Sequence, residues 1–155
     1  IHNESLDIIN PLFNLFLEKK VEIRADKYSY EKFNEKSKIK LASKSDFGEE
    51  FLDLIVSIKT VKNIDEAISH IEKFGSKHSE AIITNDEKQA KYFLDRVDAS
   101  AVFHNTSTRF NDGFELGLGA EVAVSTDKLH ARGPMGINDL MTYKWVVTGE
   151  GQLRS

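Results

Sequence analysis

The sequence predicts an α/β protein with a mostly parallel open sheet and helices on both of its faces. The main observation is the stretch from Leu54 to His104, where short apolar segments alternate with amphipathic ones. Strands are expected near residues 54–61, 81–84 and 100–103, with helices over 63–74 and 85–95 between them. Strand and helix in alternation are typical of parallel sheets joined by right-handed crossovers.

Each expected helix in this unit has a capping residue and an apolar face. Asn63 or Asp65 can cap the first helix, which ends before Gly75, and its inner face has helical spacing. That face consists of Ile64, Ala67, Ile68 and Ile71. Asn85 is the expected cap of the second helix, and the residues expected to point inward are Ala90, Phe93 and Leu94.

The residues before Leu54 predict shorter elements. Apolar residues at helical spacing over 4–19 indicate a helix, which Pro11 either starts or kinks. Residues 21–24 alternate as in a strand. The charged stretch 27–45 is ambiguous and allows a short helix around Tyr28 to Phe33 and a short strand at 39–41. Near the C-terminus we expect a short helix over 137–141 and an edge strand over 143–148.

Composition excludes several classes of function. The 155 residues suit one domain, and a net charge of −4 argues against nucleic-acid binding. The chain has no cysteine, which excludes disulfides, thiolate metal sites and a cysteine nucleophile within it. The histidines lack metal-ligand spacing, so no metal is expected. No apolar run approaches the ~20 residues of a membrane helix, so no membrane partner is expected.

The polar cluster after the strand at 100–103 is the first candidate site. Ligands of parallel sheets bind beyond the carboxyl ends of strands, and His104 begins the cluster at such an end. The candidate substrate-binding residues are Asn105, Ser107, Thr108 and Arg109. Arg109 can make paired hydrogen bonds to a carboxylate or phosphate. The alternative is a turn whose side chains satisfy local backbone groups.

Two further motifs leave structural alternatives open. Lys128, His130 and Arg132 form a basic cluster that can attract a phosphate, or can instead pair with acids such as Glu115 and Glu121. The glycines in this region have the wrong spacing for a dinucleotide fingerprint, so close backbone packing is the better interpretation. These glycines are Gly113, Gly117 and Gly119.

Several strings in the last third resemble the γ-glutamyl phosphate reductase family of the aldehyde dehydrogenase superfamily. They are NTSTRF at 105–110, FELGLGAEVAVST at 114–126, KLHARGPMG at 128–136 and LMTYKW at 140–145. The resemblance runs from Ile1 to about Gly149 and implies a C-terminal portion of such an enzyme. It assigns 1–135 to the catalytic domain and 136–155 to a C-terminal helix and an oligomerisation strand.

The resemblance also implies an activity. Such enzymes reduce γ-glutamyl phosphate to glutamate 5-semialdehyde with NADPH, in cytoplasmic proline biosynthesis. In these enzymes a cysteine thiolate displaces the phosphate, and a hydride then reduces the resulting thioester. We expect that cysteine and most of the NADPH-binding surface to lie upstream of Ile1. By superfamily register Glu50 is expected to bind the nicotinamide ribose, although a surface glutamate is the plainer interpretation. We expect a homo-oligomer formed through the strand at 143–148. The alternative from another class is a non-catalytic α/β binding or assembly module.

Overall fold

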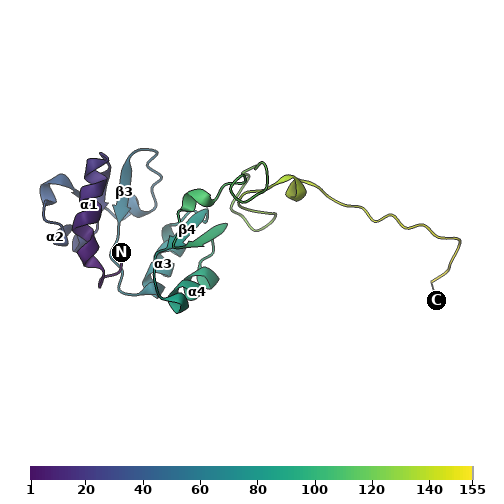
Figure 1. Cartoon of the computed structure of the whole chain (residues 1–155), viewed down its shortest axis with the longest axis horizontal. Coiled ribbons are helices and arrows are strands. Elements are labelled where there is room, and N and C mark those ends of the chain that lie inside the picture. Colours follow the sequence, from purple (N-terminus) through teal and green to yellow (C-terminus); the bar gives the residue numbers. More distant parts are fainter. Residues whose placement is uncertain (155) are drawn as a thin grey trace.

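The computed structural model describes residues 1–154 and contains two small parallel sheets (Figure 1). A three-stranded sheet has the order β2-β1-β3, and a two-stranded sheet pairs β4 with β5. The strands are β1 (Glu22–Ala25), β2 (Lys40–Leu41), β3 (Ile55–Ile58), β4 (Ser79–Ile82) and β5 (Ala101–His104). The α-helices are α1 (Ile9–Glu18), α2 (Lys27–Lys32), α3 (Ile64–Phe74) and α4 (Glu87–Arg96). Short 3₁₀ turns are η1 (Leu6–Ile8), η2 (Lys36–Lys38), η3 (Ser45–Phe47), η4 (Thr108–Phe110) and η5 (Ile137–Leu140).

The first core lies between the three-stranded sheet and helices α1 and α2. Ile9 and Phe13 of α1 are fully buried, as is Ile23 of β1. The rings of Phe13 and Phe33 lie 5.1 Å apart, which joins the end of α2 to α1. Pro11 sits in the first turn of α1, where the missing N–H has no helical partner to lose, so the helix is not broken there.

The second core lies between helices α3 and α4 and the two-stranded sheet. Phe93 of α4 and Val97, the residue that follows this helix, are buried, and Ile68 of α3 packs against them. Ile82 and Val102 extend this cluster onto β4 and β5. Burying one apolar stripe of each helix against the same small sheet is the expected use of amphipathic helices.

The predicted fold class is confirmed, but the strands are grouped differently from the single sheet expected over residues 54–104. β3 pairs with β1, with Ile23 opposite Val56 and Ala25 opposite Ile58. Helix α3 therefore leads from one sheet to the other, and within residues 54–104 only β4-α4-β5 is a crossover inside one sheet. Sequence periodicity predicts the strands, but it does not determine which strand edges meet.

Three local predictions were wrong. Asp86 rather than Asn85 caps α4, because its carboxylate accepts the N–H groups of Lys88 and Gln89. Leu94 is 39% exposed, because the buried stripe of α4 follows Ala90, Phe93 and Val97 instead. Strand β4 begins two residues earlier than expected.

Gly75 does end α3, but in an extended conformation with φ of −71° rather than the left-handed one common after helices. A glycine is still favoured there, because an added Cβ would lie 2.7 Å from the Ile71 carbonyl oxygen.

The expected final strand does not form within the chain. Residues 143–148 are extended but pair with no strand in the part of the chain that the structure describes. Figure 1 shows this segment leading away from both sheets. Tyr143, Trp145 and Val147 are 81–88% exposed, so the predicted buried face is absent. A strand needs a partner edge, and this segment reaches none.

Candidate functional site

A groove at the amino ends of β4 and β5 contains Glu50, the candidate cofactor residue. It has a volume of about 620 Å³ and lies between the loop after η3 and the residues that lead into β4. Its lining residues are Phe47, Gly48, Glu49, Glu50, Phe74, Ser76, His78, Ser79 and Thr126. The groove therefore lies at the opposite strand ends from those expected by the carboxyl-end rule.

The chemistry of this groove fits a ribose better than a phosphate. Glu50 is exposed, and its carboxylate forms no hydrogen bond or ion pair within residues 1–154. It can therefore accept hydrogen bonds from two ribose hydroxyls. No lysine or arginine is among the lining residues of the groove, so they supply no countercharge for a phosphate. The aromatic rings of Phe47 and Phe74 add apolar surface beside it.

The loop after β5 is held to the end of β4 by an amide. Asn105 has φ of 53°, and its side-chain Oδ1 accepts the N–H of Thr84 at 2.9 Å. Its Nδ2 donates to the Thr84 carbonyl at 2.8 Å, and His104 Nε2 lies 2.9 Å from the same oxygen. Both ends of the Asn105 amide are thus engaged with the backbone, and the structure gives this residue a role in shaping the loop.

The remaining loop residues differ in how the fold uses them. The hydroxyl of Ser107 accepts the Arg109 N–H at 3.2 Å and so caps η4. Thr108 and Arg109 are exposed. Arg109 lines a shallow hollow with Phe110 and two acids, and its guanidinium forms no ion pair within residues 1–154. Of the four candidates, Arg109 carries the charge that an anionic ligand would use, and it lies outside the groove that contains Glu50.

Two residues of the basic cluster, Lys128 and Arg132, form ion pairs with an acid of the same chain. Lys128 and Arg132 each form an ion pair of 2.8 Å with Asp98, an acid outside the pair expected from sequence. Hydrogen bonds from these two cations lower the pKa of Asp98 to about 2. His130 Nδ1 lies 3.0 Å from the carbonyl oxygen of Ala131. The structure therefore supports the second interpretation of this cluster, in which the basic residues pair with an acid instead of binding a phosphate.

Close backbone packing explains the first of the three glycines. A Cβ on Gly113 would lie 2.6 Å from the Cβ of Glu121, so only glycine fits there. Gly117 and Gly119 instead adopt φ of 75°, a left-handed conformation that glycine reaches without strain.

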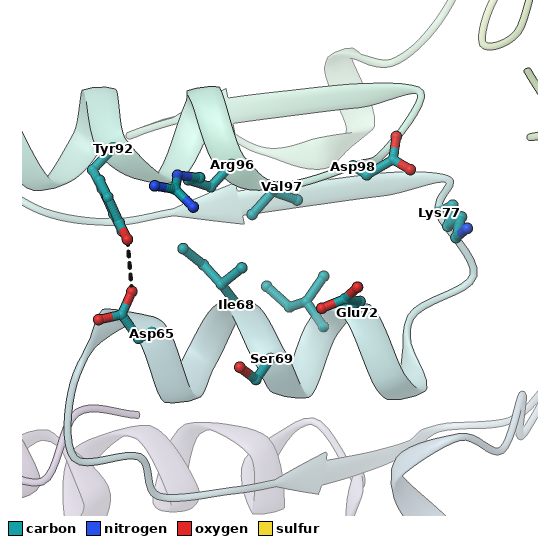
Figure 2. A pocket seen from close by; sticks show the side chains of 10 residues that line it. Asp65, Ile68, Ser69, Glu72, Lys77, Tyr92, Arg96, Val97 and Asp98 are labelled. Atoms are coloured by element: carbon teal, nitrogen blue, oxygen red, sulfur yellow. Dashed lines mark hydrogen bonds between the residues drawn. The ribbon is translucent and has the colours of Figure 1, made fainter.

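A second hollow lies between α3 and α4 (Figure 2). Figure 2 shows Asp65 and Tyr92 facing each other across it, and the Tyr92 hydroxyl donates to Asp65 Oδ1 at 2.8 Å. The Arg96 guanidinium lies 5.1 Å from the centre of the Tyr92 ring. Ile68 and Val97 line the hollow between the helices. The hydrogen bond between Tyr92 and Asp65 joins the two helices, whereas the contact between Arg96 and Tyr92 lies within α4. This hollow shares no lining residue with the groove that contains Glu50.

Within residues 1–154 no group of histidine and acidic side chains is placed to hold a metal ion. None of the helices in the same residues has the length and apolar character needed to cross a membrane.

Comparison with known proteins shows what the chain is similar to. Its α/β fold is aldehyde-dehydrogenase-like, as its overlap with solved reductases shows. The structure of γ-glutamyl phosphate reductase from Thermotoga maritima overlaps 99% of this chain with a TM-score of 0.91 and 41% identity. The Saccharomyces cerevisiae enzyme overlaps 75% of it with a TM-score of 0.50 and 31% identity.

Curated sequences agree with the structures. γ-Glutamyl phosphate reductase from Clostridium botulinum is 51% identical over 148 residues, and that from Chlorobium limicola is 49% identical over 158. These matches cover 96% and 100% of this chain, but only 35% and 38% of the relatives. No family model matches the sequence. The chain belongs to the γ-glutamyl phosphate reductase family and spans about a third of the length of these relatives.

Proposed function

We propose that this chain is the C-terminal part of a cytoplasmic, NADPH-dependent reductase that converts γ-glutamyl phosphate to glutamate 5-semialdehyde in proline biosynthesis. The observation that carries the proposal is the overlap of 99% of the chain with the Thermotoga maritima reductase. Identity near 50% over almost the whole chain supports the same assignment. The chain has no cysteine, so the thiolate nucleophile belongs to residues outside it.

In this proposal the chain binds and orients the cofactor and the substrate, and it does not supply the nucleophile. When bound, the nicotinamide cofactor supplies a hydride to the activated carbonyl group. Glu50 accepts hydrogen bonds from the ribose hydroxyls in a groove without a competing partner for its carboxylate. Arg109 attracts the acyl phosphate, with Thr108 and Ser107 beside it.

A chimaera tests the proposal. The matched 37% of the Thermotoga maritima reductase is replaced by residues 1–154 of this chain, and phosphate-dependent reduction of NADP⁺ by glutamate 5-semialdehyde is measured. We expect turnover by the chimaera and none by the isolated chain. Glu50→Gln should raise the KM for NADP⁺, while Glu18→Gln on the exposed end of α1 removes the same charge without effect. A folded, inactive chimaera would instead support a non-catalytic binding or assembly module.

A further inference from the structure

A smaller cavity adjoins the groove that contains Glu50 and shares two of its lining residues, His78 and Thr126. It has a volume of about 240 Å³ and is formed by the starts of β4 and β5 and by the loops that follow β5. Figure 1 shows these loops as the green and olive coils between β5 and the extended C-terminal segment. Its polar side chains come from His78, Ser100, Asn111, Glu121, Ser125 and Thr126.

One acceptor of this cavity has no partner. Asn111 donates from Nδ2 to Ser79 Oγ at 2.7 Å, whereas its Oδ1 is buried without any hydrogen-bond partner in the described residues. Ser79 Oγ also lies 2.7 Å from His78 Nδ1. In this arrangement Ser79 Oγ accepts a hydrogen bond from the Asn111 amide nitrogen, and the unpaired atom of Asn111 is its amide oxygen. Leaving such a buried group unpaired is costly.

The same cavity contains the carboxylate of Glu121, of which only one oxygen has a hydrogen-bond partner in the described residues. Glu121 accepts the Gly113 N–H at 2.7 Å through Oε2, and its Oε1 has no partner within residues 1–154. No lysine or arginine is among the lining residues. A ligand that pairs with both residues donates hydrogen bonds, and positive charge strengthens its contact with the Glu121 carboxylate.

We propose that this cavity binds the α-ammonium group of an amino-acid substrate. An ammonium has three donors and no acceptor, which matches an amide oxygen and a carboxylate without a countercharge. The identity of the amino acid rests on the proposed function: the α-ammonium of the γ-glutamyl group occupies this cavity.

Ligand binding to the isolated chain tests the cavity directly. L-Glutamate and glutarate differ by the α-ammonium group alone, and the Gly113 backbone and Asn111 side-chain amide resonances report on the cavity. We expect L-glutamate to shift both resonances and glutarate to leave them unchanged. Glu121→Gln keeps an acceptor for Gly113 but loses the charge, and should weaken L-glutamate binding at least about tenfold. Glu18→Gln should bind as the unaltered chain does.

The outcomes separate this inference from the proposed function. If glutarate shifts the same resonances equally, or neither ligand shifts them, the ammonium site is wrong and water satisfies Asn111. In an active chimaera, Glu121→Gln should raise the KM for glutamate 5-semialdehyde and leave the KM values for phosphate and NADP⁺ unchanged. A chimaera without activity contradicts the proposed function, while the comparison of glutamate with glutarate still decides the site.

Discussion

Arg109 is the residue of the 105–109 loop whose charge the fold does not use. The amide of Asn105 and the hydroxyl of Ser107 are engaged with the backbone, whereas the Arg109 guanidinium is exposed and without an ion pair in residues 1–154. We therefore expect that removing it would change ligand binding more than folding.

In an active chimaera, Arg109→Ala should raise the KM for phosphate about tenfold to a hundredfold. The reason is the loss of a charge-assisted hydrogen bond worth about 1.5–3 kcal/mol. Steady-state kinetics with phosphate varied measures this, and the KM for NADP⁺ serves as the internal control. Unchanged kinetics in a folded variant would show that the loop is only a turn.

The carboxylate of Asp26 makes polar contacts with two separate segments beside the first core. It caps α2 by accepting the Ser29 N–H at 2.9 Å, and its other oxygen accepts the Thr60 N–H at 2.9 Å. The hydroxyls of Ser29 and Thr60 lie 2.6 Å apart, and Ser29 is fully buried. One carboxylate thus joins the start of α2 to the residues after β3.

Asp26→Ala should lower the free energy of unfolding by about 2–4 kcal/mol, since it removes a helix cap and leaves the Thr60 N–H unpaired. Urea denaturation measures this. Asp86→Ala is the matched control, because Asp86 caps α4 without reaching another element, and it should cost only about 1 kcal/mol. Equal losses would contradict the role of Asp26 as a link between two elements.

At the scale of elements, η3 packs against α3 through three rings. Phe47 of η3 lies 5.3 Å from the His70 ring and 6.0 Å from the Phe74 ring. Burial, followed by the nearby charge of Lys59, lowers the pKa of His70. His70 is partly buried because η3 covers that part of α3.

The contact predicts a pH dependence. Because the folded pKa of His70 lies below its ordinary value of 6.5, the unfolded chain binds the proton more readily. Stability contributed by neutral His70 is complete above pH 6.5 and falls as the pH drops through 6.5 toward the folded value. We expect the urea midpoint to fall from pH 7.5 to 5.5, and to fall less in His70→Phe. The same decrease in both proteins would contradict this assignment.

At the scale of the whole molecule, the exposed C-terminal segment has no partner strand within residues 1–154 of its own chain. Trp145 and Val147 are 85% and 88% exposed, and the rings of Tyr143 and Trp145 lie 6.0 Å apart. An apolar extended segment with unpaired backbone groups can pair with the edge strand of a sheet in another chain. We propose that it pairs with a second subunit.

Deleting residues from Tyr143 onward should therefore weaken self-association of the chimaera. Light scattering of the full and shortened proteins measures the mass, and NADP⁺ binding controls for folding. If both have the same mass, the segment packs within its own subunit.

The sequence by itself determined the longer helices, the alternation of strands and helices over 54–104, and the family. Apolar spacing predicted α1, α3 and α4, and the strings at 105–145 predicted the relationship to γ-glutamyl phosphate reductases that the comparisons confirmed. These features are local, because a helix stripe or a motif is read from neighbouring residues. Only the tertiary structure decided that β3 pairs with β1, that Asp98 holds Lys128 and Arg132, and that Asn111 and Glu121 line one cavity. Those contacts join residues far apart in the chain, and periodicity carries no information about which distant edges and charges meet.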